Sequence, residues 1–538
     1  MSANVFPDID VRSYHVFRRD DEAFLFDRAT GATLKVDDFT YSVMGRYADK
    51  GDSASARETL FGELELEEED DEADVWSIVT KLHDQGLFRY RPVIQDEQQE
   101  LMEELWRHAP RRVQLLMAQG CNLGCRYCYA WRNGSNQKGT LMPWEIAKAS
   151  VDHLVRNSRS RTDLQVTFFG GEPLLNLPTI RRVVEYCRTL EQTSEKRFVF
   201  ELITNGTLLD KETADWVASE KFLLFISLDG WEEMHNYNRP SMSGENLHQV
   251  ILNNARYAAK LYSAEGLPAV KVRANLTSKY HDIMAVGDYL VSQDFTNIGI
   301  GPIEPLPHGD GSPSALTEDQ MELLHEQTLN TMVACVKSLE KGEKIGVFAG
   351  KLIQNALRQL QPRLLKGITC GVARNTQVVD NRGNIFPCHR YEGMEAYIIG
   401  NVLSGGLDRE KTMAYYRKVN GNATNRCHSC WIRDYCAGGC AWLLSAKDGH
   451  LADPTERECN RRRKSMESAL WMRQRMRAAF PDRFKADGEI DLDSWDWGAA
   501  NDLNEVTDDD VSKLNTMGAS KSSCGSSCET CGPSGCAD

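Results

Sequence analysis

Three closely spaced cysteines are the first feature of this chain that could carry chemistry. Cys121, Cys125 and Cys128 follow a C-x3-C-x2-C spacing directly after an apolar run. Three thiolates can bind three irons of a [4Fe–4S] cube and leave the fourth iron without a protein ligand. Such an open metal position allows a substrate or cofactor to coordinate. A structural zinc site normally has four protein ligands, and no fourth one lies nearby in sequence, so the spacing favours the cube.

Seven further cysteines lie between residues 370 and 459. They are Cys370, Cys388, Cys427, Cys430, Cys436, Cys440 and Cys459. Zinc ribbons lack the five-residue and three-residue intervals that separate Cys430, Cys436 and Cys440. In a chain without secretory features, such groups indicate metal ligands rather than disulfides. We therefore predict a second metal-binding region.

Four more cysteines crowd the C-terminal tail, which is rich in Ser and Gly. They are Cys524, Cys528, Cys531 and Cys536. These residues could bind a further cluster or zinc, pass thiols or clusters to other sites, or lie in a flexible segment, and the sequence leaves all three open. Cys187 and Cys335 stand alone in helical stretches. We expect both to be ordinary buried residues.

The first triad, with Tyr127 before its last cysteine, resembles the signature of the radical S-adenosylmethionine enzymes. Three later segments match that superfamily in order. They are Phe169-Gly-Gly-Glu-Pro173, Thr204-Asn-Gly-Thr207, and Ser227-Leu-Asp-Gly230 followed by His235 and Asn238-Arg239. The resemblance implies that S-adenosylmethionine is bound by these motifs and by two later strand ends. The implied residues are Gly170, Gly171, Glu172, Pro173, Ser227, Arg239, Asn275 and Ile303.

The chemistry of these residues suits the roles that the resemblance implies. Two glycines permit close backbone approach, and Glu172 can accept hydrogen bonds from the methionyl ammonium group. Arg239, with Ser227, would hold the methionyl carboxylate. Asn275 and the Gly299–Ile303 run would contact ribose and adenine. Taken singly, each of these segments would also fit a turn or a strand end.

The seven-cysteine array resembles the SPASM extension of radical enzymes that act on peptides. The resemblance implies two auxiliary [4Fe–4S] clusters and therefore three clusters in all. One would be held by Cys427, Cys430, Cys436 and Cys459, and the other by Cys370, Cys388 and Cys440. Because the second set has only three cysteines, we hypothesise an open iron that binds a Cys thiolate of the substrate.

The residue after Cys388 separates two groups within this family. Formylglycine-forming sulfatase maturases carry an Asp at that place, whereas this chain has His389. Their proposed catalytic base is therefore missing, and their activity becomes a weaker expectation. The sequence Phe386-Pro-Cys-His-Arg390 resembles thioether-forming peptide maturases instead. A structural role for His389 and Arg390 remains the alternative, and we assign no catalytic residue.

Apolar runs that alternate with helical stretches predict the fold that positions these motifs. Between residues 112 and 310 the runs are 113–117, 164–169, 198–203, 222–226, 270–274 and 298–300. Buried strands alternating with helices imply βαβ units and a parallel sheet. We expect an α/β fold, a partial (β/α)6 TIM-like barrel, whose site lies where the strands end.

The flanking regions differ in composition and hydropathy pattern, and we assign them to further domains. Residues 1–92 predict a winged-helix-like unit, with turns at 18–22 and 27–33 and helices ending at Gly86. This unit resembles the element of peptide maturases to which a leader segment adds as an extra strand. A DNA-binding winged helix is the alternative, and the acids of 63–74 argue against it. We assign the rest as a linker helix at 93–111, bridging helices at 311–365, a Cys-rich SPASM domain ending in a basic helix at 366–479, and an acidic, then Cys-rich tail at 480–538.

Composition limits the classes of partner. The net charge is −15, which disfavours general binding to nucleic acid or to anionic membranes. No apolar run approaches the length that spans a bilayer, and the N-terminus lacks the features of a signal peptide. We expect a cytoplasmic protein with no nucleic-acid or membrane partner.

Together these features predict an S-adenosylmethionine-dependent radical maturase of a ribosomally produced peptide or protein subunit, one that joins a Cys sulfur to carbon as a thioether. Its partners would be a peptide substrate with a leader segment and an electron donor such as flavodoxin or ferredoxin. One alternative is another radical outcome on a peptide, such as carbon–carbon cross-linking, oxidation or epimerisation. The other is a non-enzymatic metal-binding scaffold.

Overall fold

The computed structural model describes most of the chain. The described residues are 13–50, 77, 80–89, 103, 106–107, 109–132, 139–305, 312–360, 373, 375–420, 427, 430–436, 439–445, 449 and 451–484. Several predictions fall outside these residues. They concern Cys370, the four tail cysteines, most of the 93–111 linker helix and the whole acidic stretch 63–74.

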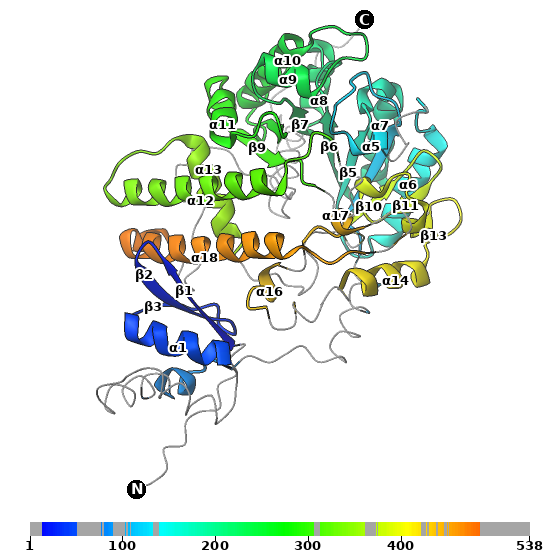
Figure 1. Ribbon diagram of the computed structural model, residues 1–538. Helices are drawn as coiled ribbons and strands as arrows, with labels where there is room; N and C mark the ends of the chain where they lie inside the picture. Colours follow the sequence, from blue (N-terminus) through cyan, green and yellow to red (C-terminus); the bar gives the residue numbers. More distant parts are fainter. Residues whose placement is uncertain are drawn as a thin grey trace, which may run out of the picture.

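A parallel sheet forms the centre of the molecule (Figure 1). Its six barrel strands are β4 (Arg112–Ala118), β5 (Asp163–Gly170), β6 (Arg197–Thr204), β7 (Leu223–Ser227), β8 (Lys271–Leu276) and β9 (Asn297–Pro302). Neighbours in the sheet are also neighbours in the chain, and every pair is parallel. These strands coincide with the six predicted apolar runs, so the mostly parallel α/β fold is confirmed.

Helices return the chain between successive strands. The longer ones are α6 (Trp144–Asn157), α7 (Leu177–Thr193), α8 (Lys211–Ser219), α10 (His248–Ala264) and α11 (Ile283–Ser292). Shorter turns follow the strand ends, namely α5 (Tyr129–Arg132), η3 (Pro173–Asn176) and α9 (Glu232–Asn238). Each helix buries one apolar stripe against the sheet and returns the chain to the edge where the strands begin. Because the six strands are parallel, their carboxyl ends all lie at the opposite edge.

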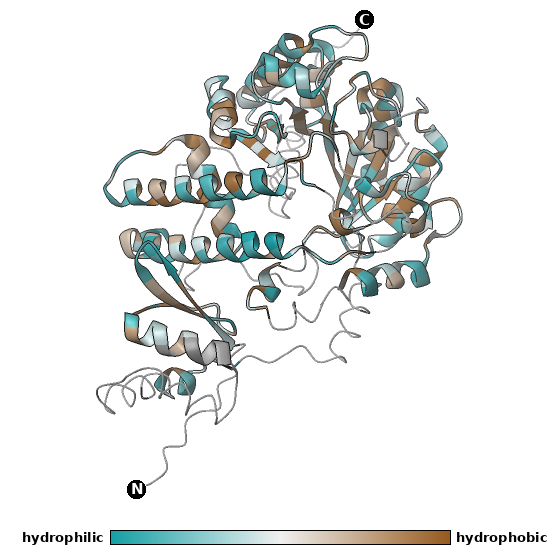
Figure 2. Cartoon of the chain, in the orientation of Figure 1, coloured by the Kyte–Doolittle hydropathy of each residue, from teal (hydrophilic) through white to brown (hydrophobic). Residues whose placement is uncertain are grey.

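Alternation along β5 shows how the strands are buried on both faces. Leu164, Val166 and Phe168 are completely buried in the main hydrophobic core. Gln165 points to the opposite, inner face, where its Nε2 donates to Glu201 Oε2 on β6 at 2.8 Å. Hydropathy colouring shows the brown strands between helices that are teal on the outside (Figure 2). The inner face is therefore closed partly by polar contacts, which the apolar runs alone did not predict.

Four strands from the Cys-rich region extend the same sheet. They are β10 (Thr376–Val379), β11 (Asn384–Phe386), β12 (Gly400–Asn401) and β13 (Gly406–Leu407). β10 pairs in parallel with β4, and the next three pairings are antiparallel. The sheet thus has ten strands in the described residues, with β9 and β13 at its edges. Short turns η4 (His389–Tyr391) and η5 (Glu395–Tyr397) and helix α14 (Arg409–Asn420) complete this region.

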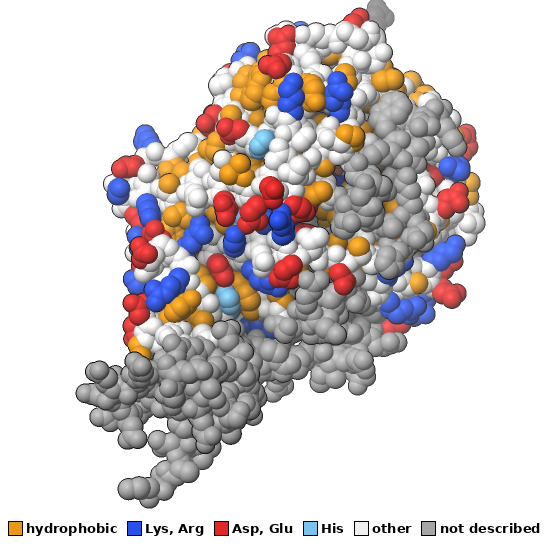
Figure 3. Space-filling view, in the orientation of Figure 1, with side chains coloured by type: hydrophobic (Ala, Val, Ile, Leu, Met, Phe, Trp, Pro, Cys, Tyr) orange, Lys and Arg blue, Asp and Glu red, His pale blue; other side chains and the backbone are white. Residues whose placement is uncertain are grey.

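Two long helices, α12 (Glu318–Glu340) and α18 (Glu456–Ala479), lie side by side (Figure 1). Acidic side chains of α12 meet basic ones of α18, as in the Arg461–Glu318 and Lys464–Glu322 ion pairs, both 2.8 Å. Figure 3 shows red and blue side chains gathered along this line. Helix α13 (Val347–Arg358) packs against both. Helices thus lie where the sequence predicted them in 311–365 and after the cysteines, whereas the assignment of these ranges to a bridging segment and a SPASM domain stays a prediction.

The N-terminal strands form a separate three-stranded antiparallel sheet. Strands β1 (Tyr14–Arg19), β2 (Glu22–Asp27) and β3 (Thr33–Val36) pair in that order, and α1 (Asp38–Lys50) covers one face. Asp20 and Asp21 form the first turn with positive φ angles, and Gly86 (φ +97°) follows the last helical turn of its segment. The predicted turns are confirmed, whereas a complete winged helix stays a prediction.

Three short elements complete the described chain: α16 (Arg433–Cys436), α17 (Ala441–Leu444) and η6 (Pro481–Arg483). No helix among the described residues is long and apolar enough to cross a membrane.

Candidate functional site

The cysteine triad lies on the loop between β4 and α5, at the edge where the barrel strands end. Leu123 donates its backbone N–H to Cys121 Sγ at 3.4 Å, and Asn205 Nδ2 approaches the same sulfur at 3.6 Å. Arg239 Nη1 lies 4.0 Å from Cys125 Sγ. Donors that point at sulfur stabilise thiolates and tune the potential of a cluster bound to them.

Burial makes this loop a poor place for free thiolates. It raises the pKa of Cys121 to about 11 and that of Cys125 to about 12. Coordination to iron removes the proton, because a bound metal ion supplies the missing positive charge. Within the described ranges, no three Cys, His, Asp or Glu side chains gather tightly enough for a single metal ion. A cube binds each thiolate to a different iron, so three thiols on one short loop fit a [4Fe–4S] cluster.

The two glycines after β5 let the backbone lie against the cluster loop. Gly170 has φ +124°, and a Cβ there would lie 2.5 Å from the Ala118 carbonyl oxygen. Gly171 N–H donates to that oxygen at 2.7 Å, and Glu172 N–H donates to the carbonyl of Gly120 at 3.0 Å. No other residue type would allow this approach at position 170.

Glu172 is fully buried and ties β5 to β6. Its carboxylate accepts from the backbone N–H of Leu174 (3.0 Å), from Thr204 Oγ1 (2.7 Å) and from the backbone N–H of Asn205 (2.8 Å). Burial raises the pKa of Glu172 to about 7 despite these donors. Glu172 thus connects its own motif by hydrogen bonds to the motif that begins at Thr204. Its contact with a methionyl ammonium group stays a prediction. Pro173 begins η3 directly after it.

Asp229 is a residue that our sequence reasoning missed. It is completely buried, accepts from Tyr127 Oη at 2.6 Å and from the Asn275 backbone N–H at 2.9 Å, and lies 3.1 Å from Arg239 Nε. It therefore connects the cluster loop, the end of β8 and α9. Its motif was visible in the sequence, but only the fold brings Arg239, ten residues later, back to its carboxylate.

This contact changes the interpretation of Arg239. The guanidinium is buried between Asp229 and Cys125, and it stacks 5.4 Å from the centre of the Tyr127 ring. A carboxylate of the protein already balances its charge, so binding of the methionyl carboxylate stays a prediction. Ser227 ends β7, and its side chain remains partly exposed.

The later strand ends complete this edge of the barrel. Asn275 lies near the end of β8 with its side chain partly exposed, while Ile303 donates its backbone N–H to the Leu276 carbonyl at 2.9 Å. The structure therefore places the predicted residues of β5, β7, β8 and β9 at the same edge as the triad. This edge can hold an anionic or zwitterionic ligand beside three thiols.

Cys459 lies in the first turn of α18, and burial raises its pKa. The charge of Arg463 lowers that pKa, whereas the charges of Cys436 and Cys427 raise it. Arg463, one turn further along the helix, also contacts Cys430. The four thiols stay predicted ligands, and their chemistry fits a [4Fe–4S] cluster.

The neighbours of Cys388 and Cys440 in the chain contact residues beside the triad and at the end of β5. The ring of His389 lies 4.9 Å from Phe169, at the end of β5, and 5.8 Å from Tyr129, which follows Cys128. Tyr129 also meets Trp442, two residues after Cys440, at 5.9 Å. Burial lowers the pKa of His389 to about 3, so its imidazole is neutral at pH 7. Aromatic side chains thus connect the two cysteine arrays.

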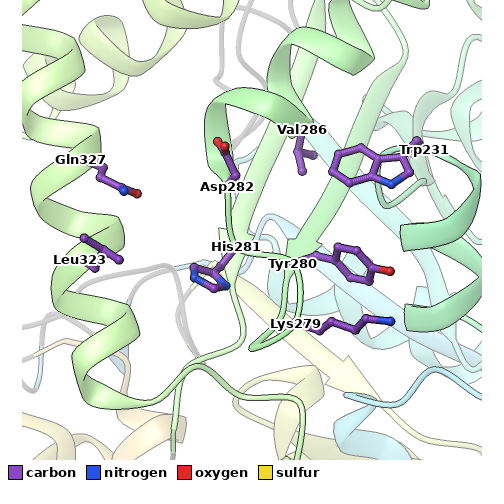
Figure 4. Close-up of a pocket in the computed structure, with 8 residues that line it drawn as sticks. All are labelled: Trp231, Lys279, Tyr280, His281, Asp282, Val286, Leu323 and Gln327. Carbon is purple, nitrogen blue, oxygen red and sulfur yellow. The ribbon is translucent and has the colours of Figure 1, made fainter.

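One well-formed cavity, about 260 Å³ in volume, lies outside this site (Figure 4). It lies between the loops after β7 and β8 and helix α12, and Trp231, His281 and Leu323 are among its lining residues. None of the predicted ligands or nucleotide contacts lines it. We therefore keep the candidate site at the strand ends.

Comparison with known proteins agrees with this geometry. Residues 115–270 match the model of the radical SAM superfamily. A cysteine-type anaerobic sulfatase-maturating enzyme from Clostridium perfringens is 24% identical over 351 residues, which cover 62% of this chain and 88% of that protein. The radical SAM cyclopropyl synthase TigE from Paramaledivibacter caminithermalis is 22% identical over 468 residues, covering 81% and 90%.

A solved structure has a similar fold. Native anSMEcpe with bound AdoMet and a Cp18Cys peptide superposes with a TM-score of 0.55 at 22% identity, covering 69% of this chain and 99% of that one. At this identity the likeness shows the fold alone.

Proposed function

We propose that this protein, which is a radical SAM enzyme by the domain at residues 115–270, acts as a maturase that joins a Cys sulfur of a peptide or small protein to one of its carbons. Its relatives include an enzyme that matures sulfatases and one that makes cyclopropyl groups. The first name supports a protein substrate. Thioether formation is our finer proposal, and it rests on the residues around Cys388.

The cofactors supply the difficult step, and the chain positions them. A [4Fe–4S] cluster with S-adenosylmethionine supplies a 5′-deoxyadenosyl radical that removes a hydrogen atom from an unactivated carbon. Cys121, Cys125 and Cys128 would hold that cluster. Glycines 170 and 171 let the backbone lie against the cluster loop, and Ser227 and Asn275 are exposed enough to contact the methionyl group.

A second set of thiols would receive the substrate sulfur. Cys370, Cys388 and Cys440 would hold a cluster with one iron available to that sulfur, which binds as a thiolate after losing its proton. Phe169, His389 and Tyr129 line the space between this set and the triad. Their rings would exclude water while a carbon radical exists. Overall, one C–H and one S–H bond break, one C–S bond forms, and the surplus electron passes to the iron–sulfur centres.

Substrate recognition and reduction need two further partners. We propose that the N-terminal sheet binds a leader segment as an added strand, because main-chain hydrogen bonds at a sheet edge give affinity without a deep pocket. An external carrier such as flavodoxin or ferredoxin would reduce the triad cluster. The set of Cys427, Cys430, Cys436 and Cys459 would hold the third cluster.

The observation that carries this proposal is the contact of Tyr129 with both His389 and Trp442. It places the residue after Cys128 directly against the residue after Cys388, so hydrogen removal and sulfur capture can occur in one shared space.

The test is co-expression under anaerobic conditions with Cys-containing peptides encoded by neighbouring short reading frames. We expect 5′-deoxyadenosine to form, and the peptide to lose two hydrogens and one alkylatable thiol. Loss of two hydrogens with the thiol intact would favour a carbon–carbon cross-link or oxidation instead. An unchanged mass with inverted stereochemistry would favour epimerisation. Absence of 5′-deoxyadenosine from fully iron-loaded protein would overturn the proposal.

A further inference from the structure

One face of the N-terminal sheet consists of aromatic rings. His15, Phe17, Phe24 and Phe26 point to the same side, and cross-strand pairing places Phe17 opposite Phe24 and His15 opposite Phe26. Phe17 and Phe24 stack at 5.3 Å. We call these four residues the aromatic face. The other side of β1 faces α1, where Tyr14 Oη donates to the Met44 carbonyl at 2.9 Å.

The aromatic face packs on the loop that carries two predicted cluster ligands. The His15 ring stacks on Trp431 at 3.9 Å, with only 8° between the ring planes. Phe26 meets Trp431 edge-on at 5.8 Å and Tyr435 at 5.9 Å. Trp431 directly follows Cys430, and Tyr435 directly precedes Cys436. Both ligand positions are therefore one residue away from a ring held by the sheet.

Helix α18 carries the predicted ligand Cys459 in its first turn, and its later turns contact the same sheet. His15 Nε2 lies 2.9 Å from Glu467 Oε1, Trp471 Nε1 donates to Glu22 Oε2 at 3.2 Å, and Arg473 Nη2 donates to the Gly31 carbonyl at 2.7 Å. The sheet thus spans the loop and the helix that together supply the four thiols.

This double contact has an energetic consequence. A cluster bound by Cys430, Cys436 and Cys459 fixes the loop against the helix, because its ligands come from both. The aromatic face needs the same arrangement, since His15 touches Trp431 on the loop and Glu467 on the helix. Two events that favour one geometry stabilise each other, and the coupling is equal in both directions.

We propose that His15 and Trp431 are positioning residues that couple docking of the N-terminal sheet to occupancy of the Cys427, Cys430, Cys436 and Cys459 cluster. Assembly of this cluster would favour the docked position of the sheet, and docking would favour retention of the cluster. The proposal rests on the proposed function in one respect, that these four thiols hold a cluster. It assigns a conformational role to a cluster that is far from the triad in sequence.

The first test measures how fast a ferrous chelator removes iron. The background carries Cys121→Ala, Cys125→Ala, Cys128→Ala and Cys388→Ala, and also Cys524→Ala, Cys528→Ala and Cys531→Ala in the tail, so that the remaining iron reports the cluster at α18. We expect His15→Ala to accelerate iron loss about fivefold, the factor that about 1 kcal/mol of ring stacking gives. His15→Phe keeps a stacking ring and should restore most of the stability.

Arg18→Ala is the matched control, because Arg18 lies on the same strand but pairs with Asp38 of α1 at 2.6 Å. We expect it to change the rate of iron loss less than twofold. Iron loss that is equally fast in the background, in His15→Ala and in Arg18→Ala would overturn the coupling. A background protein that binds no iron would instead remove the cluster assignment, and with it this part of the proposed function.

The second test measures amide hydrogen exchange in the N-terminal sheet. Amide hydrogen exchange of residues 13–36 should become at least fivefold faster when iron is removed from the background protein, whereas residues 163–170 of β5 should not respond. Trp431→Ala should make exchange of 13–36 fast whether or not iron is bound. If exchange of 13–36 is the same with and without iron in the parent protein, the sheet is docked independently and the proposal is wrong.

Discussion

The two best-described thiol sites of this protein are built in opposite ways. The triad lies on one loop of eight residues, held by buried polar contacts inside the barrel. The site at α18 is assembled from a loop and a helix, and the contacts that fix it are rings and ion pairs between distant segments. The cysteines of the triad lie close together in the chain, and their loop depends on a few buried charges. The site at α18 depends instead on packing between the N-terminal sheet, α12 and α18. Mutations should therefore damage them in different ways.

The largest effect is expected at Asp229, on which the triad side depends. Asp229→Ala leaves the buried Arg239 charge without its partner and removes the acceptor of Tyr127 Oη. Breaking a buried ion pair from one side costs about 3–5 kcal/mol, measured as the loss in free energy of unfolding in urea. Asp215→Ala, which removes an exposed acceptor of Tyr257, is the control and should cost less than about 1 kcal/mol. Equal losses would show that Asp229 is not the centre of this network.

The next effect is a pH dependence caused by Glu172. Its pKa is raised in the folded protein to about 7 from 4.5. The folded state therefore binds more protons than the unfolded state between these values, and stability falls as pH rises through this window. Relative to Glu172→Gln, the wild type should lose up to about 3 kcal/mol between pH 4.5 and 7, since one pKa unit corresponds to about 1.4 kcal/mol. Parallel stability curves for the two proteins would contradict this assignment.

Gly170→Ala tests whether the glycine is required by space or only by its backbone angle. The new Cβ would collide with the Ala118 carbonyl, so we expect a loss of about 2 kcal/mol or more and reduced iron at the triad. Gly244→Ala is a matched control, because Gly244 also has a positive φ but open space around it. It should lose about 1 kcal/mol. Similar losses would mean that close approach at Gly170 is unimportant.

The smallest effects are expected along the α12–α18 ion pairs. Arg461→Met removes a largely buried cation that lies 2.8 Å from Glu318, and it should cost about 1–2 kcal/mol. Arg457→Met removes an exposed pair with Asp319 and should change stability by less than about 0.5 kcal/mol. Arg461→Met should also lower iron retention at α18, whereas Arg457→Met should leave it unchanged. Identical behaviour would argue against packing as the support of this site.

The sequence predicted the parts of the fold that depend on short-range patterns. The six barrel strands follow apolar runs, and their polar ends fall at one edge because parallel strands end together. The turn at Asp20 and Asp21 and the helix end at Gly86 follow from residues that tolerate positive φ. Motif spacing also located the triad on the loop after β4.

The contacts between distant segments could not be predicted in this way. No periodicity shows that Arg239 returns to Asp229, or that β10 joins β4 across more than 250 residues of chain. The stacking of His15 on Trp431 joins residues more than 400 positions apart. Each of these depends on tertiary packing, for which a single sequence carries no local signal.

The pairing of β10 with β4 has one further consequence. The chain reaches Cys388 two residues after β11, which is joined through β10 to the strand that leads into the triad. Hydrogen-bonded ladders do not stretch, so the sheet fixes the distance between the strand ends that carry the two cysteine groups. If the proposed cross-link forms there, this fixed distance would set the ring size of the product, rather than the flexibility of the peptide.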